Sequence, residues 1–189
     1  FIAVWLAAIR LGAWIVPSDP MGSAEDLMSH IERTRPKVGF CAKSRSEVYQ
    51  KACGNLPFIE IDEMSVTPEL CNFSEVESWP TPNALDRAAV MFTSGTTGLP
   101  KGVEITQANY AFAGHAMALA ASLTSDDRQF VVLPLFHANA QYYSFASAIY
   151  AGASVALMAT FSASRFLHQA AKHEVTAASL FAAPIRMIL

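Results

Sequence analysis

The stretch "MFTSGTTGLPKGVEIT", residues 91–106, concentrates three glycines, four threonines, one serine and one lysine after a short apolar run. Glycines accept backbone angles that other residues avoid, and they let a ligand come close to the main chain. Hydroxyl groups and free backbone N–H groups donate hydrogen bonds to phosphate oxygens, and the Lys101 ammonium adds a mobile positive charge. Surface turns rich in Gly, Ser and Thr are common, but this density around one cation predicts a phosphate-binding loop.

The spacing around Lys101 separates this stretch from the loop of P-loop NTPases. In that motif, Gly-Lys is followed directly by Ser or Thr. Here Pro100 precedes Lys101, and Gly102 and Val103 follow it. We interpret Glu104 as a solvated acid, so no residue near the loop is expected to position a water. The alternative of an ATP-hydrolysing protein is therefore disfavoured.

The rest of the chain alternates between strand-like and helix-like segments, which predicts an α/β fold with mainly parallel strands joined by crossover helices. The predicted strands are residues 13–17, 37–42, 58–62, 88–94, 129–134, 154–159 and 176–183. The predicted helices are residues 1–11, 23–35, 44–53, 107–123, 140–152 and 162–174, with a last one from Pro184.

A proline-rich segment divides the chain into two predicted halves. Residues 63–87 hold three prolines and show little periodicity, so we interpret them as a connecting segment. Residues 1–62 then form a first, partial α/β lobe. Residues 88–189 form a second lobe that carries the glycine-rich stretch and part of a ligand pocket.

Composition narrows the class of protein. Hydrophobic residues make up 52% of the 189 residues and charged residues 15%, so a large core is expected and disorder is not. The net charge of −3 gives no reason to expect a nucleic-acid partner. The three cysteines are Cys41, Cys53 and Cys71, an odd count without a Cys-x-x-Cys pair. We therefore expect reduced thiols in a cytoplasmic protein, and no metal-binding residue.

Two apolar regions raise the question of a membrane. The opening "FIAVWLAAIRLGAW" lacks the basic start of a signal peptide and runs into a strand and a loop. Residues 129–164 contain no Asp, Glu, Lys or Arg, but proline, glycine and several polar residues divide them into short pieces. We therefore predict buried strands and helices, and no transmembrane segment.

Two motifs resemble signatures of the adenylate-forming superfamily, which includes acyl-CoA synthetases, luciferases and the adenylation domains of peptide synthetases. "TSGTTGLPKGV", residues 93–103, is similar to the phosphate-binding signature of that family. "LPLFHANAQ", residues 133–141, resembles the second signature, in which a Pro-Leu-Phe-His run begins the wall of the acyl pocket. The resemblance covers nearly the whole chain. Its nearest members are acyl-CoA ligases, and the His-Ala-Asn-Ala-Gln form leans toward carnitine/crotonobetaine-type or fatty-acyl ligases.

The resemblance implies a function and a fold. The chain would belong to the layered αβαβα N-terminal domain of an enzyme that activates a carboxylic acid with ATP. The products of that first step are an acyl-adenylate and pyrophosphate. The acyl group then passes to a thiol, either of coenzyme A or of a phosphopantetheine carrier, and Mg²⁺ accompanies the ATP.

The resemblance also implies roles for individual residues. It places the phosphates of ATP on Thr93, Ser94, Gly95, Thr96, Thr97, Gly98 and Lys101. It gives catalytic roles to Lys101 and His137, and it lines the acyl pocket with Phe136, His137, Ala138, Asn139 and Gln141. Without the resemblance, His137 would be interpreted as a hydrogen-bonded core histidine after a strand.

Later family signatures are not found in the 189 residues. These are the Tyr-Gly-x-Thr-Glu run, the ribose-binding Asp, the hinge residue and the C-terminal catalytic lysine. We therefore interpret the chain as a piece of a longer enzyme and predict that it is inactive alone. The competing hypothesis is a non-catalytic, nucleotide-binding remnant or scaffold fragment of the same fold.

Overall fold

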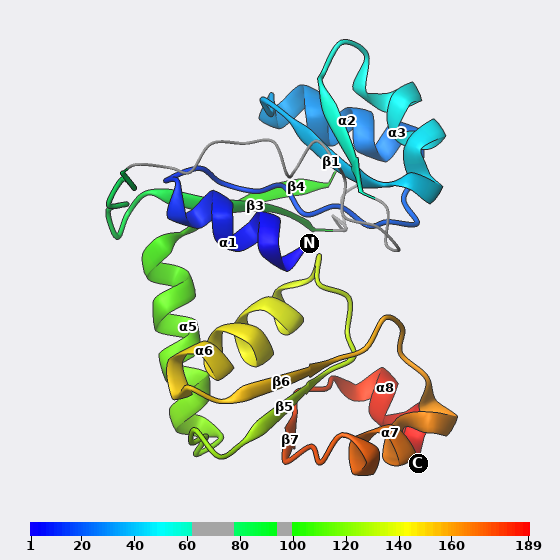
Figure 1. Ribbon diagram of the computed structural model, residues 1–189. Coiled ribbons are helices and arrows are strands. Elements are labelled where there is room, and N and C mark those ends of the chain that lie inside the picture. The colour runs from blue at the N-terminus through cyan, green and yellow to red at the C-terminus, as the bar shows by residue number, and fades with distance from the viewer. Residues whose placement is uncertain (62–77, 94–99) are drawn as a thin grey trace.

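The computed structural model describes residues 1–61, 78–93 and 100–189 (Figure 1). The N-terminal part contains α1 (Ile2–Arg10), α2 (Ala24–Thr34), η1 (Lys43–Arg45) and α3 (Ser46–Cys53). Strand β1 (Gly39–Ala42) pairs in parallel with β2 (Phe58–Ile61), and α3 is the crossover between them. Helices α2 and α3 pack against each other beside this pair. The helices predicted for this part, and the strands predicted at residues 37–42 and 58–62, are confirmed with shorter bounds.

Local capping explains where α2 starts and stops. The Ser23 hydroxyl accepts a hydrogen bond from the Asp26 amide at 3.1 Å, and the Asp26 carboxylate accepts one from the Ser23 amide at 3.2 Å. This reciprocal pair satisfies amides that have no partner in the first turn. At the other end Arg35 takes a left-handed conformation with φ 47°, and Pro36 prevents the helix from continuing.

The described residues on either side of the glycine-rich loop pair as a β-hairpin, which the sequence did not predict. Strand β3 (Arg87–Thr93) pairs antiparallel with β4 (Lys101–Thr106), whereas the prediction placed a helix directly after the loop. Residues Lys101–Glu104 of β4 are exposed, so the strand has no apolar alternation that would reveal it. The predicted strand at residues 13–17 is reduced to a single parallel bridge between Ile15 and Ala89.

Helix α5 (Gln107–Ala120) leads from the hairpin to the C-terminal, three-stranded sheet (Figure 1). It begins at the predicted cap, Thr106, whose hydroxyl accepts from the Asn109 amide at 3.2 Å. Gly114 is buried on this helix at a close approach to the segment that contains Ala146. A Cβ added at Gly114 would lie 2.7 Å from the Ala146 carbonyl oxygen. The absent side chain therefore sets the distance between the two helical segments.

The C-terminal part is built on a three-stranded parallel sheet. Strand β5 (Arg128–Val131) lies in the centre, between β6 (Ser154–Leu157) and β7 (Ala177–Ala178). The helical segments are the π-helix η2 (Asn139–Ala146), α6 (Ser147–Ala151), η3 (Ala163–Arg165), α7 (Phe166–Lys172) and α8 (Ala182–Ile188). The predicted strand at 176–183 is therefore wrong in extent, because only two of its residues pair.

Two apolar clusters hold the fold together. One surrounds Phe130 and Val131 of β5, which are almost fully buried. The other surrounds Trp5 and Tyr110, whose ring centroids lie 5.3 Å apart, together with residues of β3. Phe145 packs against both clusters and joins them. Trp5, from the first predicted lobe, packs on β3 and α5 of the second. The division of the chain into two lobes at residues 63–87 therefore stays a prediction.

Among the described strands, every pair except β3–β4 is parallel, which confirms the predicted α/β class. No helix in the described ranges combines the length and apolar character needed to cross a bilayer.

Candidate functional site

The predicted phosphate-binding residues that the structure describes lie at the end of the β3–β4 hairpin that borders residues 94–99. Thr93, the last residue of β3, faces Lys101, the first residue of β4. The Thr93 hydroxyl donates to the Lys101 carbonyl oxygen at 3.4 Å, and both residues are exposed. Their side chains are thus available to a ligand. The other predicted phosphate ligands lie outside the described residues; they are Ser94, Gly95, Thr96, Thr97 and Gly98.

Gly102, next to Lys101, lies close to side chains of β3. It lies opposite Phe92, and a Cβ added to it would be 3.0 Å from the Val90 side chain and 3.5 Å from the Phe92 ring. The glycine therefore leaves room for the Val90 side chain, whereas the Phe92 ring would be at an ordinary contact distance from the added Cβ.

Helix α2 contacts this end of the hairpin through two side chains. The His30 ring stacks on the Phe92 ring with centroids 3.9 Å apart and planes inclined by 10°. The Arg33 guanidinium lies 5.2 Å from the centre of the same ring, and its Nη1 donates to the Pro100 carbonyl oxygen. Sequence reasoning missed both residues, because their spacing on α2 indicates only that they share a helix face.

The surroundings of His30 favour its neutral form. Partial burial lowers the pKa of His30, and the nearby Arg33 charge lowers this pKa further, while Asp26 opposes the shift. Its Nδ1 is 3.0 Å from the Ser18 hydroxyl oxygen. The stacked ring is thus a neutral aromatic partner of Phe92 near pH 7.

Three of the predicted acyl-pocket residues, Phe136, His137 and Ala138, lie between β5 and η2, and the other two, Asn139 and Gln141, lie in η2. The His137 side chain is exposed, and its ring centroid lies 4.1 Å from that of Phe136. The His137 amide donates to the Pro134 carbonyl at 3.1 Å, which fixes the turn at the end of the strand. His137 is therefore accessible to a ligand and does not have the enclosed setting of a core histidine. Ala138 packs against the cluster around Trp5.

Gln141 has a different setting from His137, because its side chain is fully buried. Its Oε1 accepts a hydrogen bond from the Tyr110 hydroxyl, and its Nε2 donates to the Leu135 carbonyl at 2.5 Å. Burial raises the pKa of Tyr110, so the phenol stays protonated and remains a donor. Gln141 thus ties α5, η2 and the strand-end turn together.

Asn139 links the start of η2 to the chain beyond β7. Its Nδ2 donates to the Ser179 hydroxyl at 3.2 Å. Its Oδ1 is buried, and among the described residues it has no hydrogen-bond partner. The segment that follows is a π-helix, a form that often occurs at functional sites.

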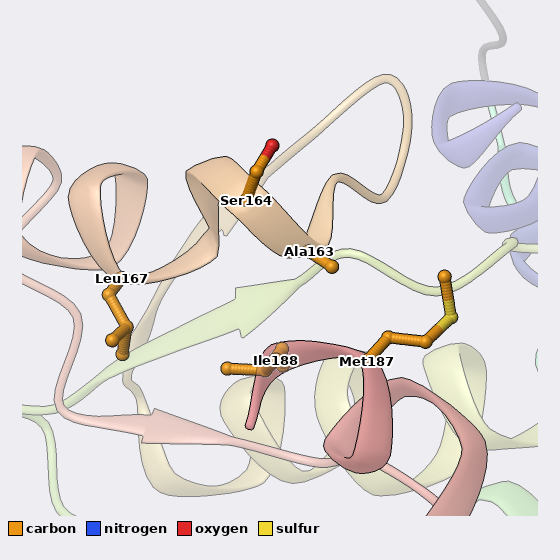
Figure 2. Close-up of a pocket in the computed structure, with 5 residues that line it drawn as sticks. All are labelled: Ala163, Ser164, Leu167, Met187 and Ile188. Carbon is orange, nitrogen blue, oxygen red and sulfur yellow. The ribbon is translucent and has the colours of Figure 1, made fainter.

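A hollow of about 460 Å³ lies elsewhere, between the start of α7 and the end of α8 (Figure 2). Leu167, Met187 and Ile188 are among the residues that line it. Figure 2 shows the Ser164 hydroxyl pointing away from Met187 and Ile188. The hollow contains no predicted site residue, and no chemistry is assigned to it.

Comparison with known proteins gives a family match over the entire chain. The profile of the AMP-binding enzyme family matches residues 1–189.

Two curated relatives show which activities occur among similar proteins. The 2-succinylbenzoate–CoA ligase of Bacillus subtilis is 41% identical over 118 residues, which are 62% of this chain and 23% of the relative. The crotonobetaine/carnitine–CoA ligase of Salmonella agona is 26% identical over an alignment that covers this whole chain and 39% of the relative. The chain thus spans less than half the length of these relatives.

A solved structure agrees with the fold. The O-succinylbenzoate coenzyme A synthetase of Bacillus subtilis, in complex with AMP, superposes with a TM-score of 0.85 at 28% identity. The match covers 99% of this chain and 47% of that chain.

Proposed function

The chain belongs to the AMP-binding enzyme family, and on this premise we propose that it is part of an AMP-forming acid–thiol ligase. The observation that carries the proposal is the strand pair in which Thr93 lies opposite Lys101 within the signature stretch, residues 93–103. The names of the relatives, both CoA ligases, support coenzyme A as the thiol, with a phosphopantetheine carrier as the alternative.

The proposed reaction has two steps. A carboxylate oxygen attacks the α-phosphorus of ATP, the bond to the bridging β-phosphate oxygen breaks, and pyrophosphate leaves. The thiol sulfur then attacks the acyl carbon, and AMP leaves with the bonding electron pair while the thiol loses its proton. Negative charge grows on the departing pyrophosphate in the first step, so a positioned cation nearby lowers the barrier.

Lys101 is the residue we propose for that role. It is exposed at the start of β4, and its compact ammonium can reach a phosphate chain without a fixed geometry. The Thr93 hydroxyl lies opposite and can donate to a phosphate oxygen. Residues 94–98 are proposed to add backbone and hydroxyl donors between these two.

His137 is proposed to orient the carboxylate at the acyl pocket. Its exposed ring beside Phe136 supports this role, because a substrate site needs a few accessible polar groups in an apolar wall. Asn139 is proposed to lie in the same wall. Gln141 is proposed to hold the wall in place from behind, since both ends of its amide are already bonded.

Magnesium is expected with ATP, but the described residues do not fit a protein-held ion. They contain no group of three or more His, Cys, Asp or Glu side chains arranged to hold a metal. No step is therefore assigned to Mg²⁺ through these residues.

We further propose a cytoplasmic location and a role in fatty-acid or aryl-acid metabolism. The buried, unpaired thiols of Cys41 and Cys53 support a reducing compartment. The net charge of −3 supports small-molecule substrates over a nucleic acid.

The test is carboxylate-dependent ATP–pyrophosphate exchange by the intact protein, with aliphatic, aromatic and carnitine-like acids. We expect exchange with one class of acid, and Lys101→Ala should lower its rate by about 10²-fold or more. Lys37→Ala, which removes an exposed positive charge elsewhere, is the matched control. The 189-residue chain alone is expected to be inactive. An intact protein that binds ATP but exchanges with no acid would favour the non-catalytic alternative.

A further inference from the structure

Helix α2 holds the hairpin at the point where Lys101 begins. Within the part of the chain that the structure describes, one interaction involving a side chain joins the closing pair of the hairpin directly, the 3.4 Å contact from Thr93 to the Lys101 carbonyl. The first four residues of β4 are exposed, so packing contributes little to holding them. The end of such an exposed strand pair is expected to fray unless another element fixes it.

A side chain of α2, Arg33, supplies the first part of that support. Arg33 donates to the Pro100 carbonyl oxygen, which belongs to the peptide unit that leads into Lys101. The proline ring restricts φ at Pro100, and the peptide plane is rigid. Fixing this oxygen therefore constrains the direction in which the chain enters β4 at Lys101.

On the other strand of the hairpin, the Phe92 ring contacts two side chains of α2. His30 stacks on its ring, and the Arg33 guanidinium lies over it at 5.2 Å. The strand before Thr93 and the residue before Lys101 are thus both attached to the same helix.

We propose that Arg33 and His30 are positioning residues that set Lys101 for the phosphates of ATP. The proposal rests on the proposed function, because it assigns a nucleotide to the hairpin. Neither residue is assigned a contact with ATP. Arg33 acts through the peptide unit before Lys101, and His30 acts through the ring of Phe92.

The experiment is a double-mutant cycle on ATP affinity, measured by titration calorimetry on the intact protein. We expect Arg33→Ala to weaken ATP binding about tenfold, the loss typical of one charge-assisted hydrogen bond. In a Lys101→Ala background the same substitution should cost less than about twofold, because its effect passes through Lys101. Lys37→Ala is the control for the loss of a positive charge.

Two further variants separate positioning from a general loss of structure. His30→Phe keeps an aromatic ring on Phe92 and should retain ATP affinity, whereas His30→Ala should weaken it. Arg33→Lys can still donate to the Pro100 carbonyl and should recover part of the loss. Thermal unfolding of each variant shows whether it is folded. If the alanine variants are unfolded, the ATP affinities of Arg33→Lys and His30→Phe test the positioning role.

Each outcome distinguishes the two proposals. If the wild-type protein binds ATP and Arg33→Ala binds it equally well, the positioning role is overturned and the proposed function stands. If Arg33→Ala weakens binding equally with and without Lys101, Arg33 acts on the nucleotide directly and the positioning role is again overturned. If the wild-type protein does not bind ATP, both proposals fall.

Discussion

Replacing Gly114 by alanine tests whether the close contact between α5 and η2 is needed. In an open helix this change would stabilise the protein by about 1 kcal/mol, because alanine is the better helix former. Here the new Cβ would lie 2.7 Å from the Ala146 carbonyl oxygen and 2.9 Å from its carbonyl carbon. These are backbone atoms, so the segments must move apart. Overpacking of this kind costs about 1–3 kcal/mol.

The two effects oppose each other, and the steric one should be larger. An overpacking cost of about 2–3 kcal/mol, reduced by a gain in helix propensity of about 1 kcal/mol, predicts a net destabilisation of about 1–2 kcal/mol for Gly114→Ala. Urea unfolding of the intact protein, followed by circular dichroism, measures it. Ala111→Gly, at an exposed position of the same helix, calibrates the propensity effect alone. A Gly114→Ala variant more stable than the wild-type protein would refute the argument.

Three more predictions concern other parts of the chain. Gln141→Leu should destabilise the protein by about 2–4 kcal/mol in urea unfolding, because it leaves the Tyr110 hydroxyl and the Leu135 carbonyl unpaired. Tyr110→Phe should cost less, and an equal or larger cost would count against this network. Thr106→Ala should cost about 1 kcal/mol by loss of the α5 cap, whereas Thr106→Ser should not; equal losses would exclude capping as the cause. The lowered pKa of His30 means that its stabilising contribution is present above its usual value of 6.5 and is lost as pH falls below that value. Unfolding between pH 5 and 8 should therefore show the wild-type protein losing stability relative to His30→Phe on acidification, and parallel curves would contradict the assignment.

Local sequence signals predicted most of the helices, because their ends are fixed by nearby residues. Ser23 and Thr106 were recognisable caps, and Gly152, with φ 71°, ends α6 as expected. The strand β4 was missed because its first four residues are exposed, and because Pro100 before it and Gly102 within it are typical of a loop. The π-helical register of η2 has no distinct sequence periodicity and was read as an ordinary helix.

The candidate site was predicted in part. Lys101 and Thr93 could be found because the signature is contiguous in sequence, and the structure places them opposite each other. Arg33 and His30 could not be found, because their relation to the hairpin depends on how α2 packs, and Arg33 is 67 residues away from Pro100. The burial of Gln141 was hidden for the same reason, since its partner Tyr110 lies on another helix.

The central position of β5 has a consequence for how the protein is made. The backbone amide of Arg128 donates to the Thr176 hydroxyl, 48 residues later in the chain, and both neighbours of β5 in the sheet follow it in sequence. A ribosome adds roughly 5–20 residues per second, so β5 is made some seconds before β7. During that interval Phe130, which is fully buried in the finished sheet, lacks the strand on one side. Until then the nascent chain presents an apolar strand edge that could pair with another chain or require a chaperone.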